Sequence, residues 1–492
     1  MARRKQSTFE RLSSGKLNRN QRKALLRRVC DEDPGLEVVH RNVAGIDIGN
    51  ESHFVAVGPD CKAHPVQEFG SWTADLQRMA DWLAACGIQQ VVMQSTGVYW
   101  IAVYEVLEQR GFAVCLTNAR ETKNLPGRKT DVQESQWLRQ MHSYGLLRNS
   151  FRPPQEIRAI RTIWRLRDRH VQEAARAIQH MQKALTKMNV QLANTISDIS
   201  GATGQAIIGA IVKGERDPYQ LARLRDYRIQ ASVEEIARSL EGNWQQDLVF
   251  ELQQPVEAYH FCHRQLLACD ERLRSYLAVL PSRSTVQTQQ LTPPEQCSPA
   301  GAGRKRKNTP AKTHKNEPQF DLRSELERIC GVNLATIDEV DVMTIQTFLS
   351  ELGTDMTRWP TEDHLVSWLK LAPRRQISGG KIIKQERSPA KNRVADALRM
   401  AASTLRMAAS TLRHSNSYLG ARFRHLTARL DPGKAVKAMA AHLARIFYRM
   451  LTHGQAWVDR GAQEHEKRRT ERERLSLERK AAALGLRLEP AA

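Results

Sequence analysis

The sequence predicts an α/β domain followed by mainly helical regions, on three observations. From Val43 short apolar runs alternate with helical patterns, which is typical of an α/β domain. Between 155 and 281 apolar residues recur three and four positions apart, which is typical of a coiled coil. After Asp321 the patterns are again largely helical. A chain of 492 residues is long enough for several such domains, so we predict an α/β plus α fold.

The N-terminal part divides into a basic arm, 1–41, and the α/β domain, 42–153. The segments VAGIDIG, HFVAVG, IQQVVMQ and FAVCLT have the short apolar runs of buried strands. Helices are predicted near 73–86 and 101–110. The first of them places four apolar side chains on one face and stops at a glycine, as expected of a helix that covers a sheet: Leu76, Met79, Ala80 and Leu83, with Gly87.

The middle region, 154–281, is predicted to be a helical coiled-coil region with a helical insertion at 198–245. Two long helices each carry an apolar seam, and they can pair as an antiparallel hairpin or across a dimer. His263 and Asp270 occupy positions of the second seam, where polar residues commonly fix the register.

Three further regions follow. Residues 282–320 include GRKRK and are predicted to be a flexible basic linker. Residues 321–461 form a second, mainly helical domain, and 462–492 a charged helical tail. Within the second domain MAASTLR occurs twice in succession, which a helix can absorb with a rotation of only about 20°.

The composition favours a polyanionic partner. Lys and Arg number 75 against 53 Asp and Glu, a net charge of +22, so nucleic acid is preferred over an anionic membrane or a merely basic protein. The eight cysteines show no CxxC pair and no secretory framework, which suits a reducing cytosol. Cys262, His263 and Cys269 lack the spacing of a zinc site and are interpreted as helix residues. Without an apolar span or signal peptide, the chain is predicted to be cytoplasmic, with no membrane partner.

Three acidic residues are candidates for a metal site. Asp47 ends the first strand of the α/β domain, and Asp131 and Glu134 share one face of a later helix. Carboxylates that converge from a strand and a helix can hold Mg²⁺, which activates water and stabilises a leaving oxygen in phosphodiester cleavage. Structural alternatives remain open, since Asp131 can be a helix N-terminal charge and Glu134 a capping partner of Thr130.

Ser378 is a candidate nucleophile. It lies in RRQISGGK, with Arg374 and Arg375 before it and Lys381 after it, where the cations can stabilise charge on a phosphoryl group. Two glycines after the serine would let a DNA backbone approach closely. Ser-Gly-Gly alone is only a turn signal.

Several motifs together resemble one family. GIDIG, STGVYW, PGRKTDVQESQWL, GLLRNSFRP, GERDP, LAPRRQISGGK and KNRVADALRMAA resemble the DEDD transposases of bacterial insertion sequences, the IS110 family, from about Val43 to His453. The resemblance implies a RuvC-like, ribonuclease H-type N-terminal domain, a coiled-coil region and a C-terminal domain with a nucleophilic serine. It also implies a structured bridge RNA that pairs with donor and target DNA.

The resemblance also assigns roles to residues. Asp47 and Asp131 match the acidic motif, whereas Gln94 stands where the family has Glu, and Glu134 where it has Asp. An amide offers Mg²⁺ only a neutral oxygen, which weakens the site. Glu105 on the next helix could substitute if that helix turned toward Asp47.

In the C-terminal domain the resemblance implies that Ser378 forms a 5′-phosphoserine link to cleaved DNA, and that the Cys330-Gly331-Val332 turn belongs to a hairpin-type element that binds nucleic-acid backbone. The residues expected either to hold DNA or RNA phosphates or to be solvated charges are Arg374, Arg375, Lys381, Lys391, Asn392, Arg393 and Arg399.

Three functions follow as hypotheses. The first is an RNA-guided DNA recombinase in which two subunits of a dimer or tetramer complete a shared site, associated with the nucleoid when bound. The second is a catalytically weakened copy that only binds RNA and DNA, as Gln94, Glu134 and the MAASTLR duplication suggest. The third is a RuvC-like nuclease that uses the carboxylates alone, for which Ser378 is dispensable.

Overall fold

The structure is a computed structural model that divides into two compact units, 1–152 and 153–492, which are described separately. It describes residues 38–58, 61, 65–95, 97–118, 131–283, 316–372, 374–378, 381–386, 393, 417–454 and 461–486, with the backbone alone for 374–378 and 381–386. Within these ranges no helix is long and apolar enough to cross a membrane.

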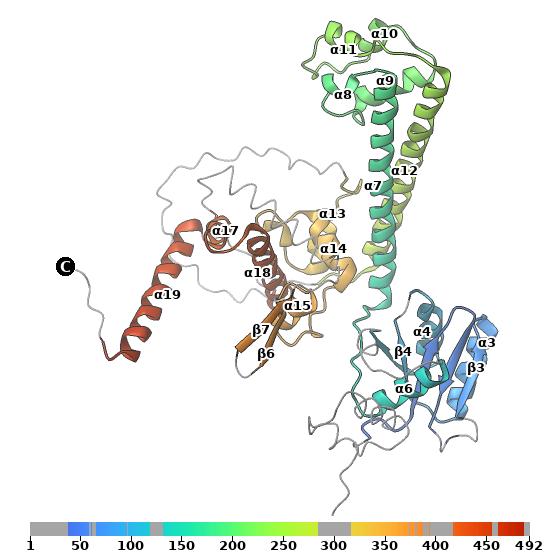
Figure 1. Cartoon of the computed structure of the whole chain (residues 1–492), viewed down its shortest axis with the longest axis vertical. Helices are drawn as coiled ribbons and strands as arrows, with labels where there is room; N and C mark the ends of the chain where they lie inside the picture. The colour runs from blue at the N-terminus through green and yellow to red at the C-terminus, as the bar shows by residue number, and fades with distance from the viewer. Residues whose placement is uncertain are drawn as a thin grey trace, which may run out of the picture. The chain divides into compact units, whose positions relative to one another are not determined.

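A five-stranded mixed sheet forms the centre of the first unit (Figure 1). Its strands are β1 (Val43–Ile48), β2 (Ser52–Ala56), β3 (Val66–Gly70), β4 (Gln90–Gln94) and β5 (Ala113–Thr117). Their order is β3-β2-β1-β4-β5, with β1, β4 and β5 parallel and β2 antiparallel to both of its neighbours. This arrangement is consistent with a ribonuclease H-like domain.

Helices cover both faces of this sheet. On one face α3 (Thr73–Ala85) and α4 (Trp100–Gln109) pack on alternate residues of the strands, such as Ile46 and Met93. The predicted helix near 73–86 is confirmed, since Leu76, Met79, Ala80 and Leu83 are all buried. On the other face Leu138 of α6 (Asp131–Ser143) packs on Val43, Val92 and Cys115.

The second unit begins with two long paired helices, α7 (Gln155–Lys187) and α12 (Gln246–Val279) (Figure 1). They run antiparallel, because Arg167 pairs with Asp270 and Lys187 with Glu251. The short helices between them are α8 (Leu192–Thr195), α9 (Ala202–Val212), α10 (Pro218–Ala222) and α11 (Val233–Ser239). They share an apolar core with the adjoining ends of α7 and α12.

Asp270 lies in the interface between the two long helices, where the sequence placed it. Its carboxylate accepts a 2.5 Å hydrogen bond from Nε of Arg167, and both side chains are buried. His263, in contrast, is exposed, and its neighbour Cys262 is buried instead. The seam of α12 therefore departs from the predicted spacing at this point, because a straight α-helix drifts by about 20° per heptad relative to a strict seven-residue repeat.

The remaining described elements follow the gap at 284–315 and are mainly helical. They are α13 (Leu322–Cys330), η1 (Leu334–Thr336), α14 (Val342–Leu352), α15 (Glu362–Trp368), β6 (Arg374–Ser378), β7 (Lys381–Glu386), α17 (Tyr418–Arg429), α18 (Pro432–His453) and α19 (Gly461–Ala483). Phe348 of α14 and Phe447 of α18 meet in the core with ring centroids 4.9 Å apart. The basic arm up to residue 37, most of the predicted linker and the MAASTLR repeat lie outside the described residues.

Candidate functional site

Helix α6 approaches β1 so closely that only a glycine fits between them. An added Cβ on Gly45 would lie 2.5 Å from the backbone nitrogen of Arg139, and the carbonyl oxygen of Ser135 is also in its way. Asp47 follows two residues later on the same strand, so its side chain leaves the sheet on the face that α6 covers. The close approach thus places the middle of α6, at Ser135 and Arg139, directly over Gly45 of β1.

Two hydrogen bonds fix the direction in which α6 crosses the sheet. At one end of β4, Oε1 of Gln90 lies 3.2 Å from Nε2 of His142, in the last turn of α6. At the other end, Nε2 of Gln94 donates to Oε1 of Glu134 at 2.5 Å, in the first turn. The N-terminal turn of α6, with Asp131 and Glu134, therefore lies at the carboxyl end of β4.

Gln94 belongs to a polar group at the carboxyl ends of three parallel strands. Ile46 pairs with Met93 in register, so Asp47 and Gln94 follow side by side at the ends of β1 and β4. Gln94 in turn pairs with Thr117 of β5. Gln94 is 6% exposed and Thr117 is fully buried, and among the described residues the Thr117 hydroxyl has no hydrogen-bond partner. The face under α6, apolar at Val43 and Val92, thus becomes polar at this edge.

The side chains at this edge of the sheet and in the first turn of α6 offer ligand atoms that fit a hard divalent cation. Asp47, Asp131 and Glu134 offer carboxylate oxygens, which Mg²⁺ prefers, and Gln94 a neutral amide. The ligand atoms of the three carboxylates do not, however, all lie within 4.8 Å of one another, since the single such group in the described part of the chain is elsewhere. The bond from Gln94 to Glu134 holds one of the three carboxylates against an amide.

Glu105 does not point toward the acidic residues. It lies on α4, which covers the opposite face of the sheet, and its carboxylate accepts a 3.2 Å hydrogen bond from Arg152. The Arg152 guanidinium also stacks on Tyr104, 3.8 Å from the ring centroid. The idea that Glu105 replaces the acidic residue absent at position 94 is therefore wrong, because α4 and α6 lie on different faces.

Ser378 is the last residue of β6 in a two-stranded antiparallel hairpin. It pairs in register with Lys381, the first residue of β7, and residues 379 and 380 between the strands lie outside the described part. Arg374 and Arg375 pair with the far end of β7. At about 3.3 Å per residue their backbone lies on the order of 10 Å or more from Ser378. Of the three cations near the serine in the sequence, the backbone places Lys381 beside it.

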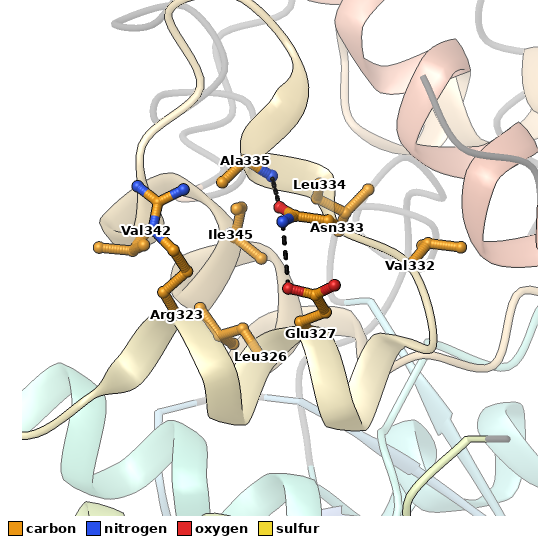
Figure 2. A pocket seen from close by; sticks show the side chains of 9 residues that line it. All are labelled: Arg323, Leu326, Glu327, Val332, Asn333, Leu334, Ala335, Val342 and Ile345. Carbon is orange, nitrogen blue, oxygen red and sulfur yellow. Dashed lines mark hydrogen bonds between the residues drawn. The ribbon is translucent and has the colours of Figure 1, made fainter. Parts of the chain in front are cut away.

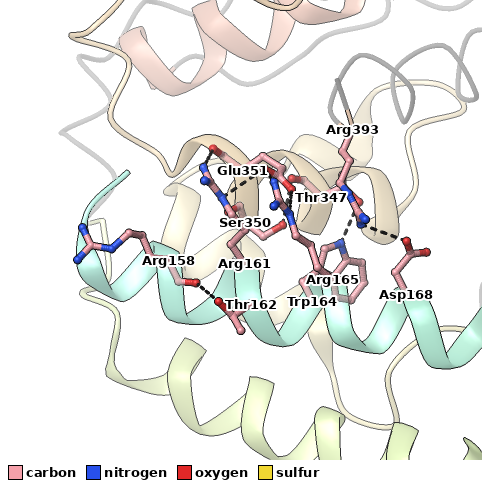
Figure 3. A network of polar contacts seen from close by, with 10 residues as sticks. All are labelled: Arg158, Arg161, Thr162, Trp164, Arg165, Asp168, Thr347, Ser350, Glu351 and Arg393. Atoms are coloured by element: carbon pink, nitrogen blue, oxygen red, sulfur yellow. Dashed lines mark hydrogen bonds and ion pairs between the residues drawn. The ribbon is translucent and has the colours of Figure 1, made fainter. Parts of the chain in front are cut away.

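Of the other predicted phosphate-binding residues the structure describes only Arg393. Its guanidinium is exposed and lies 3.1 Å from a carboxylate oxygen of Asp168 on α7 (Figure 3). Both groups are nearly half exposed, so this ion pair contributes little to stability. Lys391, Asn392 and Arg399 lie outside the described residues.

The Cys330-Gly331-Val332 turn connects α13 to η1 and α14. Gly331 ends α13 with a φ of 71°, and an added Cβ would lie 2.9 Å from Cβ of Arg283, so glycine is required there. Figure 2 shows the small pocket beyond this turn, where the Asn333 side chain donates to Glu327 and accepts from the backbone N–H of Ala335. Asn333 thereby fixes the path of the turn.

A network that the sequence did not reveal holds α14 on α7 (Figure 3). The carboxylate of Glu351 is buried, accepts two hydrogen bonds from Arg165 at 2.8 and 2.7 Å, and lies 3.2 Å from Arg161. Nε1 of Trp164 donates to the Thr347 hydroxyl at 3.1 Å. These residues are far apart in the sequence, and the helical spacing of the arginines on α7 was the one available signal.

Comparison with known proteins gives two matches. Residues 44–190 match a family model described as a transposase, the DEDD transposase of IS110 elements. Residues 332–418 match one described as the transposase IS116/IS110/IS902 family. The first range holds the sheet and the acidic residues, and the second holds the hairpin with Ser378. No curated protein matches the chain.

Both matched models describe enzymes that process DNA, so they support a transposase acting on DNA. More particularly, the two matches support an IS110-family transposase. The mixed sheet is consistent with the ribonuclease H-like domain that this assignment implies, and a domain of the DEDD type typically uses a divalent metal.

Proposed function

We propose that the chain is an RNA-guided recombinase of an insertion sequence, which cuts and rejoins DNA through Ser378 assisted by Mg²⁺ at the acidic residues. The observation that carries the proposal is the polar group under the first turn of α6. There Asp47 and Gln94 end adjacent parallel strands and Glu134 meets Gln94, within the range that matches a DEDD transposase. Ser378 stands in the second matched range.

In this proposal Ser378 does the covalent chemistry. Its Oγ forms a bond to a phosphorus of the DNA while the bond from that phosphorus to the 3′ oxygen breaks, giving a 5′-phosphoserine and a free 3′ hydroxyl. The serine proton passes to a nearby carboxylate or to solvent, and the departing 3′ oxygen takes up a proton. Attack by another 3′ hydroxyl then restores the phosphodiester and frees the serine, so that no high-energy cofactor is consumed.

The acidic residues would hold the cation. Asp47, Asp131 and Glu134 are its anionic ligands, with Gln94 as a neutral one, and the bound Mg²⁺ would stabilise charge on the phosphoryl oxygens. Lys381, the register partner of Ser378, would assist in this role, together with Arg393 once it leaves Asp168.

The partners in this proposal are donor DNA, target DNA, a structured bridge RNA and further copies of the chain. The acidic residues of domain 42–153 in one subunit and Ser378 of domain 321–461 in another would complete one site in a dimer or tetramer. The paired helices α7 and α12 would act as a coiled coil between those domains. Sequencing of RNA that co-purifies with the protein tests the guide, and the absence of any structured RNA contradicts it.

The decisive experiment compares Ser378→Ala with the matched control Ser275→Ala, which removes an exposed serine from α12. We expect a denaturation-resistant protein–DNA adduct and strand exchange with the native chain and the control, and neither with Ser378→Ala. Strand exchange by Ser378→Ala contradicts the serine mechanism. Cleavage without an adduct favours the nuclease that uses the carboxylates alone.

The weakened-copy alternative rests on Gln94, which is buried and bonded to Glu134. Gln94→Glu supplies the fourth anionic ligand that the family motif carries. Mg²⁺-dependent strand cleavage that appears only in this variant supports a chain that binds DNA and RNA without turnover. Robust and equal cleavage by both proteins excludes that alternative.

A further inference from the structure

Three potential metal ligands of different chemistry converge between the two long helices. His170 and Glu173 lie on α7 and Cys262 on α12, and their ligand atoms all lie within 4.8 Å of one another. Across the described residues they form the one such group of His, Cys, Asp or Glu side chains. The group is separate from the acidic residues of the first unit.

The distances between the ligand atoms suit an ion with tetrahedral coordination. Nδ1 of His170 lies 3.0 Å from Oε2 of Glu173, and the corresponding edge of a zinc tetrahedron measures about 3.3 Å. The Cys262 sulfur must come to about 3.5 Å from the imidazole nitrogen, a small closure from the 4.8 Å limit that contains the group. Because His170 and Glu173 are three residues apart, their side chains share one face of α7.

The ligand types select the cation. A thiolate and an imidazole favour Zn²⁺ over Mg²⁺, whereas the acidic residues near Gln94 offer only oxygen. We propose that His170, Glu173 and Cys262 form a Zn²⁺ site with three protein ligands and a fourth position open to water. Binding forms the Zn–S bond as the thiol proton passes to solvent, and the exposure of Glu173 gives the ion a path of entry.

Exposure and charge fit this site better than a plain helix ion pair. The side chain of Glu173 is 41% exposed and that of His170 14%, while Cys262 is buried in the core between the helices. A divalent cation bound there would neutralise the Glu173 carboxylate and the Cys262 thiolate together.

The position predicts a structural consequence. Along the antiparallel pair the site falls between the Arg167–Asp270 and Lys187–Glu251 ion pairs, so a bound ion would join α7 to α12 at a third point. Because the ion binds the folded pair and not the separated helices, Zn²⁺ should increase the protection of amide hydrogens on both helices.

The test uses the metal-free, reduced full-length chain titrated with Co²⁺, whose thiolate charge-transfer absorption reports sulfur ligation. We expect a thiolate band that saturates at about one ion per chain and disappears when an equal amount of Zn²⁺ is added. Cys262→Ser should lose the band. Cys269→Ser is the matched control, because Cys269 is also buried on α12 but lies outside the group.

Glu173→Gln provides a variant that should fold normally, because its side chain is partly solvated. It should weaken Co²⁺ binding by about tenfold or more. The proposal is overturned by a native chain without a thiolate band, by a band of equal strength in Cys262→Ser, or by unchanged affinity in Glu173→Gln. None of these measurements involves DNA, so they are independent of the recombinase proposal.

Discussion

The contact between Gln94 and Glu134 allows a quantitative prediction for Gln94→Glu. The substitution replaces a donating amide by a second carboxylate, with oxygen atoms about as close as the present 2.5 Å contact. Two unit charges roughly 3 Å apart repel by on the order of 5 kcal/mol at an effective dielectric constant of about 20. One carboxyl group of the new pair will therefore take up a proton, because that costs less.

The cost of this proton depends on pH in a defined direction. A glutamic acid has an ordinary pKa of about 4.3, so keeping it protonated at pH 7 costs about 3.7 kcal/mol, and at pH 5 about 1 kcal/mol. A carboxyl group whose pKa is raised in the folded state destabilises the fold increasingly as pH rises above its unfolded value. Gln94→Glu should thus be destabilised strongly at pH 7 and weakly at pH 5. Millimolar Mg²⁺ should restore most of the loss, since a cation between the carboxylates replaces the proton.

Hydrogen exchange of peptides that cover β4 and α6 measures this effect locally, at both pH values and with and without Mg²⁺. Gln94→Leu is the control, because it removes the hydrogen bond without adding charge and should lose the same protection at both pH values, with a smaller response to Mg²⁺ than Gln94→Glu. The reasoning is refuted if Gln94→Glu loses the same protection at pH 5 as at pH 7, or if Mg²⁺ affects both variants equally.

Three further predictions concern packing, a buried ion pair and pH. Gly45→Ala should lower the thermal stability of the first unit by about 1–3 kcal/mol, because its Cβ meets the backbone of α6, whereas Gly209→Ala, with open space around it, should be neutral or stabilising. Asp270→Leu should lower the hydrogen-exchange protection of α7 by about 3–5 kcal/mol, because it leaves Arg167 buried without its partner. Adding Arg167→Met should recover most of this loss. A double variant whose loss equals the sum of the two single losses contradicts the prediction. Burial and the neighbouring His40 lower the pKa of His142 to about 4. The free energy of unfolding of the first unit, measured with urea, should therefore be highest above pH 6.5 and decrease as the pH falls toward 4. His142→Gln should make this decrease smaller.

Periodicity was enough to predict the elements that bury one regular face. The apolar patterns correctly place three strands, which end at Ile48, Gln94 and Thr117. They also place the two helices that begin at Thr73 and Trp100. The strand 66–70 did not stand out, because only one residue of VQEFG is buried. An edge strand of this kind has too few apolar positions for the alternation to appear.

The surroundings of Ser378 were only partly predictable from the sequence. The sequence KIIKQE follows RRQIS after two glycines, which is a signal for a two-residue hairpin, whereas Ser-Gly-Gly alone indicates only a turn. In that hairpin Lys381 is the register partner of the serine, and the arginines at 374 and 375 are not. Proximity in sequence is not proximity in space along an extended strand, where each residue adds about 3.3 Å.

Individual side-chain contacts between distant segments could not be predicted, although the pairing of the two long helices could. Nothing in the sequence around Glu351 indicates that two arginines of α7 will bond to it, and nothing around Cys262 indicates His170 and Glu173 as neighbours. Gly45 is an exception, because a glycine inside an apolar strand predicts that another backbone approaches the strand closely. The sequence does not say that this backbone is α6.

The length of α7 gives the second unit a mechanical property. Its 33 residues extend about 50 Å. The network around Glu351 clamps the first turns of this helix, while the cap formed by α8 to α11 lies at its other end (Figure 1). From the clamp to the end of α7 is about 35 Å, so a tilt of about 5° at the clamp would move the cap by about 3 Å. The helix pair can thus act as a lever whose stiffness depends on the cross-links between α7 and α12.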